Sequence, residues 1–220
     1  MLLRLFPEHL DVLIILLPTL VFSLCCHEFS HGYVAYRLGD TTAARQGRLT
    51  LNPLAHLDPV GSMMILFVGF GWAKPVPVNP VNFSNPRIDM IKIAAAGPIS
   101  NFILSFLGAL LGTLAMKMGL GTDNIIIFFR YFIMINIYLG LFNLIPIHPL
   151  DGGQIFGNFI SKYNPRIFQQ LHKYGPKVLL AVILFGLVTE FSIIYLLIGY
   201  PSELIIKFFL RLADIMLFFL

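Results

Sequence analysis

The chain has 220 residues, of which 57% are hydrophobic and only 12% are charged. Soluble globular proteins carry about 25% charged residues, so this composition excludes a soluble enzyme and predicts a protein that faces lipid. The formal net charge of +4 comes from 15 Lys and Arg residues that form no basic run, so we expect no nucleic acid partner. Spans of about 20 residues leave little chain for a soluble module. Residues 1–220 are therefore expected to form a single integral membrane domain.

The first expected element begins with a charge-free run at 12–26. It continues through the polar sequence HEFSHGYVAYRL to Gly39, a residue that suits a helix end. Segment 59–73 is apolar but short, contains three glycines and runs into KPVPVNP, whose prolines cannot continue a helix. We therefore expect a re-entrant or hairpin-like segment between the first two core spans, and whether it crosses the membrane stays open.

Three further spans are expected after this hairpin-like segment. Segment 93–116 carries no charge, and segment 131–150 is also charge-free before it ends in prolines and the sequence LDGG. Segment 178–202 carries only Glu190, while 203–220 keeps an apolar stripe that fits a helix on the interface or packed on the bundle. The expected fold is an all-α polytopic membrane protein, a bundle of about 4–6 transmembrane helices.

The distribution of Lys and Arg predicts the orientation of these spans. Loop 37–92 holds six Lys or Arg residues, loop 117–130 holds two and loop 162–177 holds four. The positive-inside rule therefore places the first and third loops in the cytoplasm. The HEFSH end of the first helix then lies toward the cytoplasmic side.

The sequence HEFSH carries the strongest chemical signal. His27 and His31 are four residues apart, so on a helix they share one face at a spacing that suits two ligands of one zinc ion. Glu28 lies about 100° away and can reach an activated water without binding the metal, as in the H-E-x-x-H metalloprotease signature. The pattern also arises by chance, but ionisable groups at membrane depth are retained mainly for function. Asp151 is the candidate third ligand, the alternative being a helix-terminating Asp-Gly turn.

Several ordered motifs resemble one family. HEFSH in the first span, GPISN in the second and NLIPIHPLDGG in the third resemble the site-2 protease family of intramembrane zinc metalloproteases. NPLAHLDPVG and GWAKPVPVNP resemble its compact bacterial and archaeal branch, which lacks extra soluble domains. The resemblance covers residues 10–160, which we expect to form the catalytic core, with C-terminal helices at 177–220.

The resemblance implies a role for each matching residue. His27, His31 and Asp151 match ligands of one zinc ion per chain, and Glu28 matches the catalytic acid and base. Asn143 matches the residue that steadies the substrate carbonyl or its oxyanion. A neutral amide suits this task because it donates to developing negative charge without adding a second cation.

Other polar residues of the motifs have weaker assignments. Gly97 and Asn101 in GPISN are expected to pack closely on the catalytic helices, Asn101 through an interhelical hydrogen bond. His148 departs from the family pattern, and three roles stay open for it: a partner behind the metal ligands, an accessory ligand or a loop histidine. His56 lies in the loop beside the expected entrance. The sequence gives it no catalytic role, but like Asn101 and His148 it is a candidate for a residue behind the metal ligands.

The resemblance implies a protease that cleaves transmembrane segments of membrane proteins, in regulated intramembrane proteolysis. The alternative is a catalytically silent metal-binding scaffold of the same fold, against which an intact Glu28 argues, because a scaffold needs no general base. A metal-ion transporter is disfavoured because the candidate ligands cluster at one level, with Glu190 the outlier. We also expect segment 61–80 to hold an unwound substrate strand by edge pairing.

The expected partners are a transmembrane protein substrate and the lipid bilayer of a bacterial or archaeal cell membrane. A homo-oligomer and a separate regulatory membrane protein are both compatible with the chain.

Overall fold

The computed structural model describes residues 10–68, 71–189 and 193–218. Within them, four helices are long and apolar enough to cross a membrane: α1 (Leu10–Arg37), α5 (Pro86–Lys117), α6 (Asp123–Asn143) and α9 (Ile193–Met216). The other helices are α2 (Thr42–Arg45), α3 (Pro53–His56), α4 (Pro59–Val68), η2 (Pro80–Asn82), α7 (Asp151–Ser161) and α8 (Pro165–Thr189). The expected all-α polytopic membrane fold is therefore confirmed.

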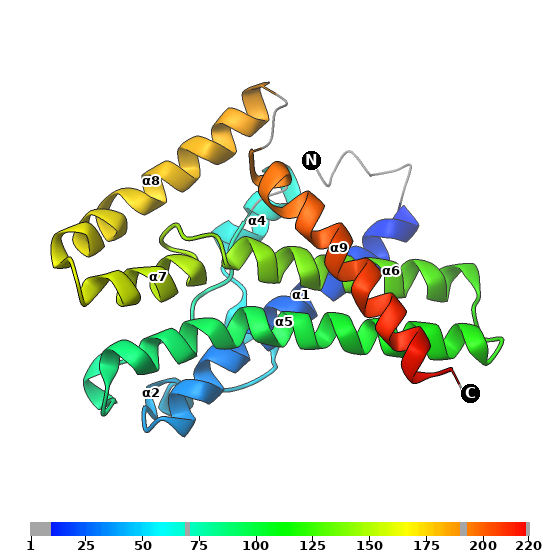
Figure 1. Cartoon of the computed structure of the whole chain (residues 1–220), viewed down its shortest axis with the longest axis horizontal. Helices are drawn as coiled ribbons and strands as arrows, with labels where there is room; N and C mark the ends of the chain where they lie inside the picture. The colour runs from blue at the N-terminus through cyan, green and yellow to red at the C-terminus, as the bar shows by residue number, and fades with distance from the viewer. Residues whose placement is uncertain (1–9, 69–70, 190–192, 219–220) are drawn as a thin grey trace.

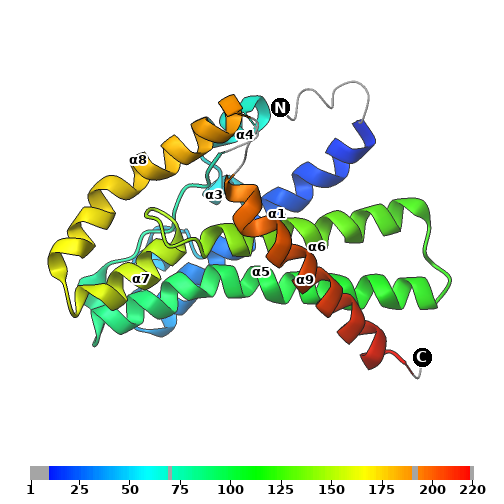
Figure 2. The same cartoon turned by 45° about the horizontal axis from the view of Figure 1, so that its top comes forward.

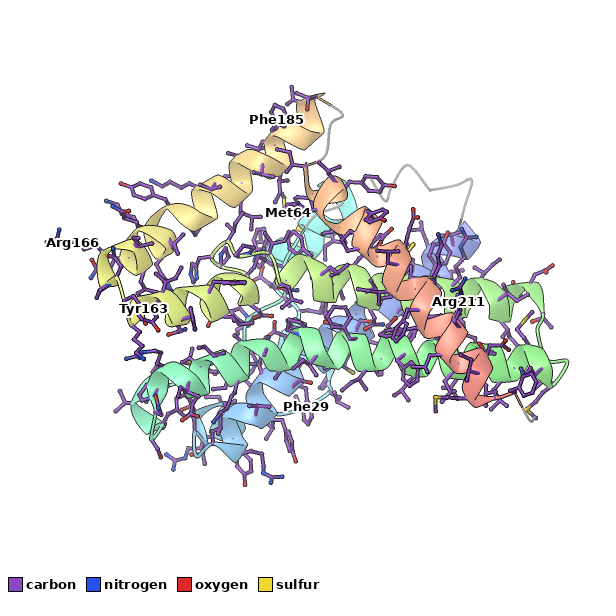
Figure 3. All side chains as sticks on the ribbon, in the orientation of Figure 1. Phe29, Met64, Tyr163, Arg166, Phe185 and Arg211 are labelled. Atoms are coloured by element: carbon purple, nitrogen blue, oxygen red, sulfur yellow. The ribbon has the colours of Figure 1, made fainter. Side chains whose placement is uncertain are left out.

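Helix α5 lies at the centre of the bundle, where it contacts α1, α6, α7 and α9. Figures 1 and 2 show α5 and α6 side by side along the long axis, while α9 crosses both. Helix α8 lies to one side, against α7 and α9. Exposed apolar side chains such as Phe185 point outward from this helix (Figure 3), as expected for a surface that faces lipid.

Small residues let the central helices approach closely. A Cβ atom on Gly108 of α5 would lie 2.7 Å from the ring of Phe132 on α6, so only glycine fits at this contact. Lipid tails are as apolar as the side chains, so close packing of this kind stabilises the bundle more than burial from water. The buried cluster at the junction of α5, α6 and α9 consists of Ala109, Ile133, Ile137 and Ala213.

Helix α5 is longer than the expected segment 93–116. It begins at Pro86, which suits the first helical position because that position needs no backbone donor. Asn85 caps the helix by accepting a hydrogen bond from the Ile88 backbone N–H. The extra residues 86–92 precede Ile93, whose carbonyl oxygen faces His31 of the first helix.

Segment 178–202 is not a single span, which corrects the sequence-based prediction. Helix α8 ends at Thr189 and α9 begins at Ile193, and the two helices run in different directions (Figure 1). Glu190 lies outside the described residues. For segment 203–220 the interface and the bundle were both open. Residues 203–216 form the second half of α9, which packs on α5 and α6.

The charges of α9 explain why residues 203–220 were set apart from the preceding segment in the sequence-based prediction. They recur at spacings of about one turn, so they gather on one stripe and leave an apolar face for α5 and α6. Lys117 at the end of α5 lies 3.5 Å from Asp214 and donates a hydrogen bond to the Leu217 carbonyl. The C-terminal end of α9 is thereby fastened to the bundle.

The segment between α3 and η2 folds back on itself, as expected. After α4 the chain returns so that Ala73 forms an isolated antiparallel bridge with Leu57. The backbones of Gly61 and Gly71 meet so closely that a Cβ on Gly71 would collide with the Gly61 carbonyl. The hairpin-like shape therefore depends on glycine at both positions, while Gly69 lies outside the described residues.

Candidate metal centre

Three side chains from two helices converge in the interior of the bundle. His27 Nε2 lies 3.0 Å from one carboxylate oxygen of Asp151, and His31 Nε2 lies 3.3 Å from the other. One ligand atom from each residue lies within 4.8 Å of the others, and no other such group of three occurs among the described residues. All three side chains are buried. The two residues on α1 and the first residue of α7 thus form one compact donor set.

The two imidazole rings are oriented from behind by oxygen acceptors. His27 Nδ1 lies 2.6 Å from Asn101 Oδ1, and His31 Nδ1 lies 2.7 Å from the Ile93 carbonyl oxygen. The Asn101 amide group donates to Asn136 Oδ1 at 3.0 Å, which leaves its oxygen to face His27. Each Nδ1 must therefore donate, so a neutral ring turns the lone pair of its Nε2 atom inward.

This donor set fits a zinc ion. Two inward-facing imidazole lone pairs beside a carboxylate would repel one another unless a cation lay between them. Two histidine nitrogens and one carboxylate are ligands that catalytic zinc takes, and hydrogen bonds to the far ring nitrogens are typical of such sites. One oxygen of Asp151 is also buried without a hydrogen-bond donor among the described residues.

Glycine residues make the convergence sterically feasible. A Cβ atom on Gly97 of α5 would lie 2.5 Å from atoms of both His27 and His31. A Cβ atom on Gly152 or Gly153, directly after Asp151, would collide with the backbone of the loop that follows α6. The GPISN and LDGG motifs therefore bring α5 and α7 against the two histidines.

Glu28 has a partner from the segment that follows the hairpin. The backbone N–H of Val76 donates a hydrogen bond to Glu28 Oε2 over 3.0 Å. Val76 is buried and lies between Pro75 and Pro77. Sequence reasoning missed this contact, because Val76 is 48 residues from Glu28 and the sequence Pro-Val-Pro does not indicate where its N–H docks.

Two further candidate residues, Asn143 and His56, form hydrogen bonds to carbonyl groups close to them in the chain. Asn143 is the last residue of α6, and its side-chain amide donates to the Leu139 carbonyl at 3.0 Å. His56 is buried, with its Nε2 atom 2.7 Å from the Thr50 carbonyl oxygen, so the described contacts tie it to its own loop.

The ring of His148 contacts that of His172 on α8, with ring centroids 3.8 Å apart and the planes tilted by 37°. Burial lowers the pKa of His148, and the neighbouring His172 lowers it further. His148 is not among the three residues that converge on Asp151.

Asn136 on α6 is a residue that the sequence reasoning missed. It is fully buried and receives the hydrogen bond from Asn101 that fixes the amide behind His27. Its own amide donates to the Phe132 carbonyl at 2.9 Å. An asparagine in an otherwise apolar span was the available signal, because a polar group at that depth needs a partner.

Comparison with known proteins finds relatives of this chain among proteins named as zinc metalloproteases. The profile of peptidase family M50 matches residues 115–186. The Bacillus subtilis protein named "Putative zinc metalloprotease YwhC" is 43% identical over 175 residues, which cover 76% of this chain and 78% of that protein.

Two mycobacterial relatives carry names of the same form. Rip2 of Mycolicibacterium smegmatis is 31% identical over 105 residues, which cover 46% of this chain and 40% of Rip2. Rip3 of Mycobacterium tuberculosis is 34% identical over 138 residues, which cover 62% of this chain and 28% of Rip3. No solved structure gives a significant match.

Proposed function

Because this chain belongs to peptidase family M50, the site-2 protease family, we propose that it is a zinc endopeptidase that cleaves transmembrane segments of other membrane proteins. Family membership and four apolar helices make it an integral membrane metalloprotease. The observation that carries the proposal is the convergence of His27, His31 and Asp151 within 4.8 Å, next to Glu28 in the chain.

His27, His31 and Asp151 would hold one zinc ion per chain. Bound zinc supplies a Lewis acid that activates water and polarises a carbonyl group. Asn101 and the Ile93 carbonyl keep the two rings oriented through their Nδ1 atoms.

Glu28 moves the proton in this proposal. Its carboxylate takes a proton from the attacking water and delivers it to the leaving amine, a double role that microscopic reversibility favours. Glu28 directly follows His27, so on the helix its side chain points about 100° away from that of His27. In this proposal it therefore faces the reacting water and not the metal. An ionised carboxylate is needed for the first transfer and a protonated one for the second.

Asn143 is proposed to stabilise the developing oxyanion. One of its amide hydrogens is used by the Leu139 carbonyl, and an amide nitrogen carries two donors. The second donor can serve the substrate carbonyl. The bond to Leu139 fixes the side chain before substrate arrives, as electrostatic stabilisation requires.

The proposed substrate is a transmembrane helix that unwinds locally. Carbonyl groups in a helix are hydrogen-bonded internally, so Gly, Pro or Asn near the scissile bond should promote cleavage. The hairpin-like segment at 61–80 is proposed to hold the unwound strand at its edge. Residues 10–160 would form the catalytic core and 177–220 the C-terminal helices of one membrane domain.

The site is proposed to lie toward the cytoplasmic side of a bacterial or archaeal cell membrane, because the loops at the HEFSH end carry most of the Lys and Arg residues. Regulation would depend on trimming of the substrate by another protease, on a homo-oligomer or on a separate membrane partner.

The test is cleavage of tagged single-span substrates in liposomes, with zinc content measured in parallel. The panel should vary Gly, Pro and Asn within the span. We compare the wild type with Glu28→Gln, which keeps the size of the side chain but cannot take the proton. Glu203→Gln, an exposed carboxylate on α9, is the matched control.

The proposal predicts that wild type and Glu203→Gln cut, while Glu28→Gln binds zinc and cuts at least about 100-fold more slowly. Equal cleavage by Glu28→Gln would remove Glu28 from the mechanism. A zinc-loaded wild type that cuts no member of the panel would favour the silent metal-binding scaffold.

A further inference from the structure

The segment that follows the hairpin lies directly on the helix that carries Glu28. Val76 donates its backbone N–H to Glu28 Oε2 over 3.0 Å. Its side chain rests on Gly32, one helical turn further along α1, where an added Cβ would lie 3.1 Å from Val76 Cγ1. Glu28 and Gly32 thus form one face of α1 that receives Val76.

The sequence of this segment leaves a single donor at the contact. Pro75 and Pro77 lack a backbone N–H, so Val76 supplies the only one in the three residues. A hydrogen bond to an ionised carboxylate is stronger than one between neutral groups. Within the described residues, no hydrogen bond reaches the other carboxylate oxygen, Oε1, of Glu28. The contact therefore distinguishes the two oxygens of the proposed base.

Two buried charged side chains hold the segment in place on either side of Val76. Before it, Arg48 Nη2 donates to the Lys74 carbonyl at 2.7 Å and to the Pro75 carbonyl at 3.2 Å. Arg48 is 9% exposed, so these bonds are shielded from water. The guanidinium group holds two successive carbonyls and so fixes the direction in which the next N–H points.

The carboxylate of Asp40 holds the part of the segment that follows Val76. It is fully buried and accepts hydrogen bonds from the Asn79 backbone N–H and the Asn82 side chain, each at 2.7 Å. Burial by itself would raise the pKa of Asp40, but the hydrogen bonds from Thr42, Asn79 and Asn82 outweigh it and lower the pKa. Asp40 is therefore ionised at neutral pH and forms charge-assisted bonds to the segment.

We infer that Val76 is a positioning residue for the proteolytic reaction: its backbone N–H holds Glu28 Oε2, so that Oε1 faces the water and takes the proton. The inference rests on the proposed function and adds the element that orients its base. Arg48 and Asp40 act through Val76 by holding the segment at both ends. Glu28 lies on a rigid helix, but its side chain has several rotatable bonds, so it needs such a partner to stay in one geometry.

The first test detects the hydrogen bond without any cleavage. The full-length, zinc-loaded protein is labelled with ¹⁵N-valine, and amide exchange is compared between wild type and Glu28→Ala. We expect Val76 to exchange at least about 10-fold faster in Glu28→Ala, since its acceptor is lost. Val78 lies in the same segment and should exchange equally in both proteins. Unchanged exchange at Val76 would overturn the inference.

The second test removes the donor and leaves the side chain intact. Replacing Val76 by its α-hydroxy acid turns the amide into an ester. The same replacement at Val81 is the matched control, because this exposed valine also follows a proline and donates to a side-chain oxygen, that of Asn79, outside segment 61–80. Cleavage is measured with the panel substrate that the wild type cuts fastest. The Val76 ester should lower kcat about 10- to 100-fold with KM and zinc content unchanged. The Val81 ester should match the wild type.

The results separate failure of this inference from failure of the proposed function. If wild type cuts, Glu28→Gln does not and both esters match the wild type, the protease function stands and the positioning role is wrong. A KM effect without a kcat effect would also overturn it, because the segment would then act in substrate binding. If the wild type cuts nothing, the proposed function and the catalytic part of the inference fall together, and amide exchange at Val76 then reports whether the bond to Glu28 exists.

Arg48 provides a check that needs no ester chemistry. Arg48→Ala removes both bonds to the Lys74 and Pro75 carbonyls, so it should lower kcat with zinc content unchanged. Arg48→Lys keeps a buried donor at the same place and should restore part of the lost rate. Equal loss of kcat in both variants, together with unchanged exchange at Val76, would contradict the role of Arg48.

Discussion

Alanine at position 97 should cost the protein most of its affinity for zinc. In the structure, a Cβ atom at this position would lie 2.5 Å from His27 Cε1, His27 Nε2 and His31 Nε2. Ordinary contact begins at 3.4 Å, so α5 or both rings must move by about 0.9 Å. Metal–ligand distances tolerate only about 0.2 Å. We therefore expect zinc affinity to fall by about 100-fold, at the upper end of the 10- to 100-fold range known for perturbed outer shells.

Helix propensity acts in the opposite direction, which makes this test selective. Alanine is favoured over glycine within a helix by about 1 kcal/mol, so Gly97→Ala should not weaken α5 itself. Zinc at 100 times its Kd stabilises a protein by about 2.7 kcal/mol, and a 100-fold loss of affinity would remove most of this. The assay is thermal unfolding with and without zinc, combined with metal content after dialysis against a chelator.

Gly112→Ala is the matched control on the same helix. Its Cβ would lie 3.0 Å from the ring of Phe129, which is a tight but milder steric contact, and Phe129 is not one of the candidate ligands. We expect Gly112→Ala to keep the zinc-dependent rise in Tm. If Gly97→Ala binds zinc as tightly as the wild type, the two histidines do not form the metal centre in the geometry described.

Two further predictions concern groups around this centre. Asn101→Ala leaves the Nδ1 donor of His27 buried without its acceptor, so zinc affinity should fall about 10- to 100-fold in competition with a chelator. The second concerns pH: the pKa of His148 is lowered in the folded protein, so protonation is disfavoured there and stability should decrease as the pH falls below about 6.5. His172→Phe keeps a ring against His148 but removes one cause of that shift. The protection factors of α8 amides, which correct for the intrinsic exchange rate at each pH, should therefore fall less between pH 7 and pH 5 than in the wild type.

The controls for these two predictions lie nearby. Ser105→Ala removes another fully buried polar group of α5, one that donates to the Ile133 carbonyl, and should leave zinc affinity unchanged. Zinc loss by Ser105→Ala as large as by Asn101→Ala would point to general damage to α5. For the histidine pair, an identical pH response of α8 in wild type and His172→Phe would show that the contact does not govern its docking.

Local sequence patterns predicted the features that depend only on neighbouring residues. His27, Glu28 and His31 could be placed on one helix because helical periodicity depends only on neighbouring residues. The fold-back of the hairpin-like segment was predictable because Pro75 and Pro77 prevent α4 from continuing into a longer helix and its glycines permit close backbone contact. The division of 178–202 between α8 and α9 was missed, because this segment carries a single charge and the charges of α9 begin only at Glu203.

By itself, the sequence determined that this protein lies in the membrane, that it is helical and that it carries a metalloprotease motif, since composition and helical spacing are properties of the chain. Only the tertiary structure decided what surrounds that motif. Asn101 behind His27 and Val76 on Glu28 are separated from their partners by 74 and 48 residues. Contacts of this kind depend on how α5 and the hairpin dock on α1, and no local pattern encodes that docking. The candidate site therefore required the fold before its proton donors and acceptors could be assigned.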